Sequence, residues 1–334
     1  MALLAVLTVY YAVAASLPHM TLWWEIVFLG VVLIPAIFGI IWLVLPLWRA
    51  KGLGLAGAAF GVLAVLCEVA SLDILADFSK LAALTLISFW FLGFFETVLW
   101  VALVAAIIPA VDAFSVFRGP TGHIVEERPS IFETIAFGFP VPGRLDIRLD
   151  WESPRLKATG YNVYRVSSGG ATPRDPLNGD DLLEGTSYSF DGVPTDEKRL
   201  YVVESMGTAG RRTASAPVPA PQPGDEAEAP TTASAGAPRN LVASAEGSFA
   251  RLGPPDILFF GLFLAAAARF RLRIGWTWLA MAASFGTTLA LAVWLELSGL
   301  PALPLLSLGF LIPNADLIWR EIRGARRRRA VTHE

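Results

Sequence analysis

The sequence predicts a polytopic α-helical membrane protein of about eight transmembrane helices, interrupted by an inserted β-sandwich domain. Of its 334 residues, 54% are hydrophobic and only 16% are charged, and the mean hydropathy is +0.56. A soluble domain of this size carries about a quarter of charged residues. The apolar residues also gather in separate runs, five before and three after a polar stretch at 118–251.

Each apolar run approaches the ~20 residues that cross a bilayer. The stretch 80–117 would be about 57 Å long as one helix, far more than a ~30 Å hydrocarbon core, so we divide it at Gly93–Glu96. The first run, Met1–Leu17, lacks the basic start of a cleavable signal peptide and is expected to remain as a span. The predicted spans are 2–18, 22–48, 53–71, 81–95, 97–117, 256–270, 275–297 and 301–319.

Basic residues follow the second, the sixth and the last run. With eight spans these clusters fall on one side, which the positive-inside rule makes the cytoplasmic face of the cell membrane. The C-terminal tail, 321–334, is then cytoplasmic and the polar insert extracytoplasmic. Beside a span, the final arginines indicate a stop-transfer anchor on anionic lipids, and we predict no nucleic-acid partner. The clusters are Arg49 with Lys51, Arg269 with Arg271 and Arg273, and Arg320 with Arg323 and Arg326–Arg329.

The insert divides by composition into three parts. Residues 118–139 are a membrane-proximal connector, 140–218 are expected to form β-strands, and 219–250, rich in Ala, Pro, Ser and Glu, are expected to be a flexible linker. Apolar and polar residues alternate with the period of two that a half-buried strand requires, and Gly, Asn, Asp and Pro separate the runs. Several such runs favour a sandwich. They are Leu145–Trp151, Tyr161–Val166, Ser187–Phe190 and Leu200–Val203.

Three features of this β segment resemble a fibronectin type III domain. Trp151, with Pro154 three residues later, is similar to the strand-B tryptophan of that family. The run Gly160–Val166 resembles strand C, and Leu200–Arg211, leading into Ser215, resembles strands F and G. The resemblance covers about 80 residues. It implies a spacer or a binding module, with a protein partner outside the cytoplasm that binds through 140–218.

Two aspartates, Asp112 and Asp256, lie within apolar runs on either side of the insert. A carboxylate at bilayer depth costs at least ~2.5 kcal/mol, so two of them suggest a pair that meets across helices. A close pair of carboxylates shares one proton, so that one acts as a base and the other as an acid. Asp112 precedes Arg118 by six residues and Asp256 begins its span, which places both near the extracytoplasmic face.

The sequence predicts neither a metal site nor a cofactor. The single cysteine, Cys67, lies in an apolar run, so no disulfide framework or cysteine-based metal site is expected. The three histidines, His19, His123 and His333, are too far apart along the chain to indicate a zinc site.

Three blocks follow one another along the chain: Glu96–Pro120 with Asp112, Arg251–Leu264 with Asp256, and Gly299–Phe310 with the motif Pro-Ala-Leu at 301–303. In this order they resemble the presenilin and signal peptide peptidase family of intramembrane aspartyl proteases. The resemblance implies a presenilin-like bundle, with segments 1–117 and 251–320 carrying one aspartate each. It implies hydrolysis of peptide bonds in transmembrane substrates, with Asp112 and Asp256 catalytic. The residues implied to position the substrate are Gly253, Pro301, Ala302 and Leu303.

The chain departs from this family at two positions and in its number of spans. Val111 stands where the family has tyrosine, and Pro255 replaces the glycine before the second aspartate. Proline fixes φ and lacks an N–H, although it suits a first helical turn. The family has nine spans against the eight predicted here. An alternative reading is therefore a membrane receptor or scaffold that has lost catalysis and binds a partner through its fibronectin-like domain. A third is a transporter whose acids relay protons.

Overall fold

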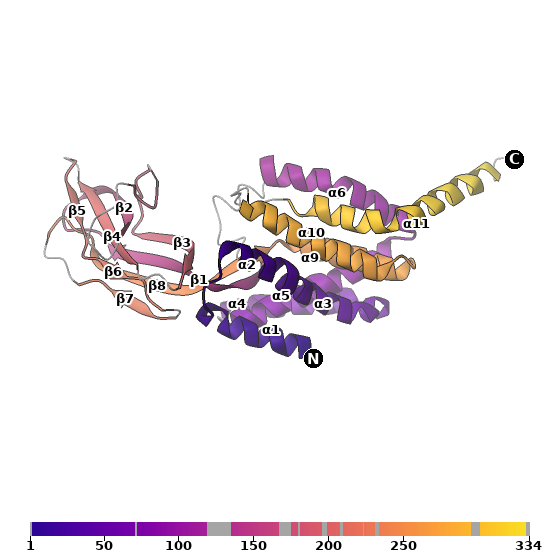
Figure 1. Ribbon diagram of the computed structural model, residues 1–334, viewed down its shortest axis with the longest axis horizontal. Helices are drawn as coiled ribbons and strands as arrows, with labels where there is room; N and C mark the ends of the chain where they lie inside the picture. The colour runs from indigo at the N-terminus through magenta and orange to yellow at the C-terminus, as the bar shows by residue number, and fades with distance from the viewer. Residues whose placement is uncertain are drawn as a thin grey trace. The chain divides into compact units, whose positions relative to one another are not determined.

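The computed structural model describes residues 2–70, 72–118, 135–166, 175–179, 181–195, 199–207, 210–222, 224–230, 234–294 and 301–331. The chain forms two compact units, whose helices and strands are labelled in Figure 1. We call one the helical unit (Met1–Tyr11, Leu22–Phe139 and Ala250–Glu334) and the other the β unit (Ala12–Thr21 and Pro140–Phe249).

Each predicted apolar run contains a helical stretch. The fourth begins earlier than predicted, since α5 starts at Asp73 and so includes the charged residues Asp77 and Lys80, and the last continues beyond 319 to Val331. The α-helices are α1 (Ala2–Val13), α2 (Leu22–Val27), α3 (Ile34–Val44), α4 (Leu53–Val69), α5 (Asp73–Phe91), α6 (Val98–Arg118), α9 (Pro254–Arg269), α10 (Ile274–Trp294) and α11 (Leu303–Val331). A π-helix, η2 (Phe28–Leu33), joins α2 to α3, and short 3₁₀ turns are η1 (Ala14–Ser16), η3 (Leu45–Arg49) and η4 (Leu92–Phe94).

Among the described residues, four helical stretches are long and apolar enough to cross a membrane. They are Leu22–Arg49, Asp73–Phe94, Val98–Ser115 and Ile274–Leu291. Two shorter apolar stretches are Ala2–Ser16 and Leu53–Val69. The structure therefore has a helical part compatible with a membrane and a separate β-sheet part. The total of eight spans stays a prediction.

The first predicted span is shorter than expected. Helix α1 ends at Val13, and Ala12–Thr21 belong to the β unit, where Ala15 packs against the hydrophobic core. This segment passes so close to Gly143 that a Cβ there would overlap the backbone of His19. Gly143 also has a positive φ of 66°, which favours glycine. Helix α1 therefore has 12 residues, fewer than the ~20 of a full span.

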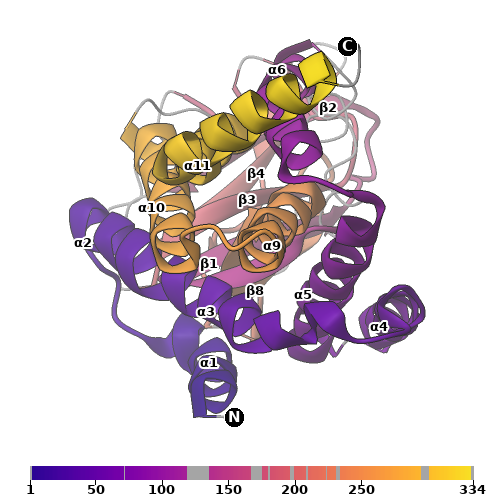
Figure 2. The ribbon, with the colours of Figure 1, turned by 90° about the vertical axis from the view of Figure 1, so that its right-hand side faces the viewer.

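Helix α9 lies at the centre of the helical unit. It packs against α5, α6, α10 and α11, and Figure 2 shows it enclosed by its neighbours. Phe260 stacks on Phe38 of α3, and Phe263 stacks on Phe310 of α11, with ring centroids 3.9 and 4.8 Å apart. A Cβ on Gly261 would overlap the hydroxyl of Ser88, so glycine permits the close approach of α5. The helix that carries Asp256 in its first turn is thus packed against several other helices.

The β unit consists of two antiparallel sheets, as the alternating runs predicted. One sheet has the order β3-β1-β8-β7, and the other has the order β2-β4-β5 with β6 beside β4. The strands are β1 (Phe137–Glu152), β2 (Ala158–Val166), β3 (Ser187–Pro194), β4 (Leu200–Gly207), β5 (Arg212–Ala214), β6 (Val218–Pro219), β7 (Glu226–Glu228) and β8 (Arg239–Leu252). Strands of both sheets share one core, in which Trp151 meets Tyr161 edge to face, with 5.4 Å between ring centroids.

The prediction of a flexible linker over 219–250 is wrong for its second half. Strand β8 occupies 239–252 and lies between β1 and β7 in the first sheet. Leu241, Ala243 and Ala245 alternate into the core and are at most 2% exposed. Because alanine is small, a strand with two alanines on its inner face fits opposite large side chains of the core. The same alanines give the strand a composition that resembles a linker.

The connector predicted at 118–139 ends inside the helical unit. Its residues 119–134 lie outside the described residues, while Phe137 and Phe139 begin β1 and are 0% and 2% exposed. Gly138 lies between them, and both its backbone N–H and its carbonyl form hydrogen bonds to side chains. Its N–H donates to Oδ1 of Asp77 at 3.2 Å, and its carbonyl accepts from the hydroxyl of Tyr11 at 2.8 Å. Side chains of α1 and α5 therefore hold the start of β1 among the helices.

Candidate carboxylate site

Asp112 lies on α6, six residues before the helix ends at Arg118, and its side chain is partly buried. Pro109, one turn earlier, cannot donate the helical hydrogen bond to the carbonyl of Ala105. The helix continues through this position because α11 packs along it. The helix that carries Asp112 therefore lacks one backbone hydrogen bond in the turn before the carboxylate.

The carboxylate of Asp112 binds the first residue of α11. The backbone N–H of Leu303 donates to Oδ2 of Asp112 at 3.2 Å. The first N–H groups of a helix have no partner within the helix, and the positive end of the helix dipole attracts an anion. Leu303 itself is 2% exposed, so its N–H has little access to water. Asp112 therefore caps α11 from another helix.

Asp256 occupies the third position of α9. Its Oδ2 accepts the N–H of Gly253 at 3.2 Å, and its own N–H donates to the carbonyl of Gly253 at 3.0 Å. Pro254 and Pro255 fill the first two helical positions, whose N–H groups a helix does not use. The turn from Gly253 to Asp256 therefore fixes the carboxylate at the start of the central helix.

Pro255 is compatible with this geometry. Gly253, on the other side of Pro254, has φ −62° and ψ 146°, an extended conformation open to any residue. A Cβ on Gly253 would lie 3.3 Å from Oδ2 of Asp256. Because glycine has no Cβ, the carboxylate can lie close to the backbone of residue 253. Pro255 is exposed and lies in the first helical turn. Pro255 therefore does not prevent the carboxylate of Asp256 from facing the site.

The two aspartates lie on neighbouring helices, because α6 and α9 pack against each other. Through Leu303, the first turn of α11 joins the same site. Three segments that are distant in the sequence thus meet around two carboxylates.

The remaining predicted positions lie beside this site. Pro301 and Ala302 are partly buried and directly precede Leu303, and the carbonyl of Ala302 accepts the N–H of Leu306 at 3.0 Å. Val111 is 53% exposed on α6. In the ranges that the structure describes, no group of three or more His, Cys, Asp or Glu side chains is arranged to hold a metal ion.

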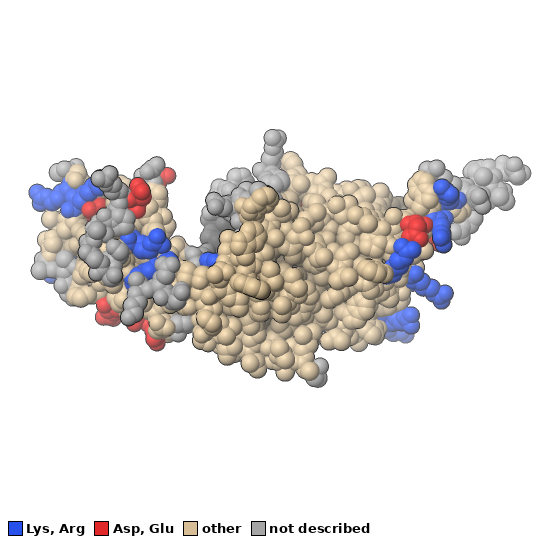
Figure 3. All heavy atoms as spheres, viewed as in Figure 1, with Lys and Arg blue, Asp and Glu red and all other residues tan. Residues whose placement is uncertain are grey.

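The site lies toward one end of the helical unit and the basic residues toward the other. Helix α9 runs from Asp256 to Arg269, about 20 Å at 1.5 Å per residue. Near its far end, Arg269 donates to the carbonyl of Leu92 at 2.7 Å, and Arg273 pairs with Asp316 at 2.9 Å. Figure 3 shows most of the exposed Lys and Arg side chains of this unit gathered at the end from which α11 projects. The side chains of Arg326–Arg329 lie outside those described.

Sequence reasoning missed the buried acid Asp77 on α5. Besides Gly138, its Oδ1 contacts Nζ of Lys80 at 3.5 Å, and Lys80 pairs with Glu68 of α4 at 2.9 Å. The Asp77 and Lys80 side chains are 9% and 10% exposed. Opposite charges three residues apart in an apolar stretch were the available signal. We read this cluster as structural, because each charge has a partner.

Comparison of the chain with models of protein families, with curated proteins and with solved structures finds no match. The carboxylate site therefore has to be interpreted from its own geometry and from the sequence blocks that form it.

Proposed function

We propose that this protein is an intramembrane aspartyl protease similar to the presenilin and signal peptide peptidase family. One observation carries the proposal: Asp112 and Asp256 lie on two helices that pack against each other, and Asp112 binds Leu303, the last residue of the Pro-Ala-Leu motif. The three sequence blocks that resemble the family are the three segments that meet there. The full eight-span bundle is part of the same proposal.

The chemistry follows from two carboxylates that share one proton. The ionised carboxylate removes a proton from water as the water oxygen bonds to the peptide carbonyl carbon, and the protonated one donates to the carbonyl oxygen. When the resulting diol collapses, the C–N bond breaks and the leaving nitrogen takes a proton from the carboxyl that gained it. As the carbonyl re-forms, one diol hydroxyl gives its proton to the other carboxylate, so that the two carboxylates again share one proton.

The depth of the site suits a substrate that is a transmembrane segment. If the basic end of the unit marks one membrane surface, the carboxylates lie about 20 Å from it, within a hydrocarbon core of about 30 Å. Backbone without internal hydrogen bonds is tolerated at that depth only where it lines a cavity or is buried in protein. At Pro301–Leu303, proline lacks an N–H and the N–H of Leu303 bonds to Asp112 instead of to its own helix, so this segment would position an unwound substrate together with Gly253.

The decisive experiment compares carboxamide variants in the full-length protein reconstituted in lipid vesicles. Asp112→Asn and Asp256→Asn should each lower the cleavage rate of a single-span model peptide by about 100- to 10,000-fold. Asp316→Asn, which removes a carboxylate at the basic end, is the matched control and should keep the parental rate. Cleavage that continues in both site variants would overturn the protease proposal. No cleavage by the parent protein would instead favour a receptor or scaffold.

We also propose that the protein lies in the cytoplasmic membrane with the β unit outside and the C-terminus inside. In this orientation the β unit would recruit or screen the exported parts of substrates, in the manner of a fibronectin type III module. The single native cysteine, Cys67, is buried, so a Cys67→Ala background carries single new cysteines cleanly. A membrane-impermeant thiol reagent should label Glu184→Cys in intact cells and should label Arg323→Cys only after lysis. The reverse pattern would invert the orientation.

A further inference from the structure

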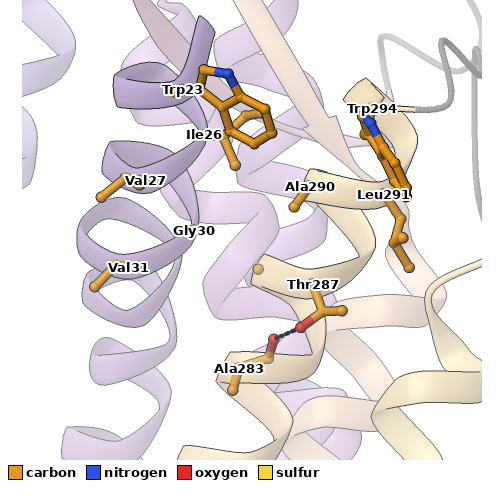
Figure 4. A pocket seen from close by; sticks show the side chains of 11 residues that line it. Trp23, Ile26, Val27, Gly30, Val31, Ala283, Thr287, Ala290, Leu291 and Trp294 are labelled. Atoms are coloured by element: carbon orange, nitrogen blue, oxygen red, sulfur yellow. Dashed lines mark hydrogen bonds between the residues drawn. The ribbon is translucent and has the colours of Figure 1, made fainter.

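A groove separates the stretch α2–η2 from helix α10 on the helical unit. Its volume is about 600 Å³, and its walls are labelled in Figure 4. The two helices touch at Gly30 and Gly286, where a Cβ built on Gly286 would lie 3.0 Å from the carbonyl oxygen of Gly30. The glycines bring the helices together at one point, and the bulkier residues on either side leave the space open.

The walls of the groove are almost wholly apolar. None of the eleven described residues that line it is charged. Its one hydroxyl, on Thr287, already donates to the carbonyl of Ala283 at 2.9 Å. A polar or charged ligand body would lose its hydration there without gaining a partner. The part of a ligand that lies in the groove must therefore be hydrocarbon.

Two tryptophans stand at one end of the groove, one on each wall. Figure 4 shows Trp23 from α2 and Trp294 from the end of α10 at the same level. They are 66% and 68% exposed; Trp23 lies near the start of the candidate span Leu22–Arg49, and Trp294 is the last residue of α10, three residues beyond the candidate span Ile274–Leu291. Among the described residues neither indole N–H has a hydrogen-bond partner. Tryptophan favours the membrane interface, where its ring is apolar and its N–H meets polar groups.

The volume of the groove decides between two hydrocarbon occupants. A transmembrane helix about 10 Å wide and about 30 Å long displaces about 2,400 Å³. The groove is too small to enclose such a helix. An extended acyl chain is only one methylene wide and follows a narrow channel between two helices.

We propose that the groove binds one acyl chain of a diacyl glycerophospholipid, with an ester carbonyl accepting a hydrogen bond from the indole N–H of Trp23 or Trp294. The ester groups of such a lipid lie at the boundary between hydrocarbon and head groups, at the level where tryptophans are enriched. The chain then runs from the two tryptophans toward Gly30 and Gly286. This site is separate from the carboxylates and does not depend on proteolysis.

Photo-crosslinking of the full-length protein in phosphatidylcholine vesicles tests the site. The vesicles contain a small fraction of phosphatidylcholine with a diazirine in one acyl chain, and adducts are located by peptide mass spectrometry. Adducts should concentrate on the peptides that contain Trp23–Val31 and Ala283–Trp294. Adducts spread evenly over every exposed apolar helix face would overturn the proposal.

Variants that fill the groove make the test specific. Ala290→Phe places a ring where several methylenes would lie and should lower adduct yield at the groove about tenfold. Ala283→Phe does the same from a second position, in case the first variant is unstable. Ala59→Phe, on the exposed face of α4, is the matched control and should leave the adducts unchanged. An equal yield in groove and control variants would contradict the assignment.

The ester contact is tested by removing the two N–H donors while keeping aromatic rings. Trp23→Phe with Trp294→Phe should reduce labelling by the phospholipid probe and leave labelling by a diazirine alkane, which has no acceptor, unchanged. If the two probes label the parent protein equally and the double variant changes neither, the ligand is a free hydrocarbon chain and the glycerophospholipid assignment fails. A single-span peptide that displaces the phospholipid from the groove would show a helix to be the occupant and would equally overturn it.

Discussion

The backbone N–H of Leu303 donates a hydrogen bond to Asp112, although 191 residues separate them in the sequence. The bond joins the first turn of α11 to the carboxylate on α6. It makes Asp112 both a candidate catalytic group and a helix cap. A change at Asp112 therefore affects local structure as well as charge, and the two effects have to be measured separately.

Amide hydrogen exchange measures the effect of a change at Asp112 on local structure, separately from its effect on charge. Asp112→Ala removes a hydrogen bond to a charged group, which contributes about 1.5–3 kcal/mol, so the Leu303 amide should exchange about 10- to 100-fold faster. Asp256→Ala should accelerate exchange at Gly253 and leave Leu303 unchanged, because Asp256 bonds only to its own turn among the described contacts. Exchange at Leu303 that is equal in Asp112→Ala and in the parent protein would show that the cap does not form.

Pro255 provides a second prediction. It is exposed in the first turn of α9, where a missing N–H costs nothing. Pro255→Gly should keep the proposed cleavage activity and lower the free energy of unfolding by about 0.4–1 kcal/mol, because glycine gives the unfolded chain more freedom. Thermal unfolding and peptide cleavage, measured on the same preparation, check both parts. A large gain in activity would show that proline restrains the carboxylate.

Much of the helical unit could be predicted from the sequence. Long apolar runs leave few alternatives to helices, since a backbone in lipid must bond to itself. Helix α5 was the weakest case, because Asp77 and Lys80 lower the local hydropathy before residue 81. Their charges are paired with each other and with Glu68, and only the fold shows that pairing. The hydrogen bond from Leu303 to Asp112 could not be derived from spacing, and the family resemblance implied only that Leu303 positions the substrate.

The β unit shows a different limit of sequence reasoning. The strands that carry Leu145, Tyr161 and Leu200 alternate large apolar residues with polar ones, so they were predicted. Strand β8 has Ala243 and Ala245 at inward positions, and alanine gives almost no hydropathy contrast. Its place between β1 and β7 depends on the side chains of the second sheet that share its core, among them Tyr161 and Tyr201.

The buried charges near Gly138 give a third prediction. Lys80→Met leaves Asp77 and Glu68 without their cation and should lower the free energy of unfolding in lipid bicelles by about 3–5 kcal/mol. Adding Asp77→Asn should restore part of this loss. The asparagine oxygen still accepts the N–H of Gly138, and one uncompensated charge is gone. A double variant no more stable than Lys80→Met alone would show that the charge of Asp77 is solvated.

Strand β8 gives the last prediction, which distinguishes a strand from a linker. Ala243 is fully buried in the core of the β unit, so Ala243→Leu forces three additional carbon atoms into a packed interior. Overpacking of this kind should lower the free energy of unfolding of the β unit by about 1–3 kcal/mol. Glu246→Leu, an exposed position on the same strand, is the control and should change it little. Thermal unfolding followed by the fluorescence of Trp151 measures both variants against a Trp-depleted background. If Ala243→Leu and Glu246→Leu unfold at the same temperature as the parent, residues 239–252 do not pack in the sheet, and the original linker interpretation would stand.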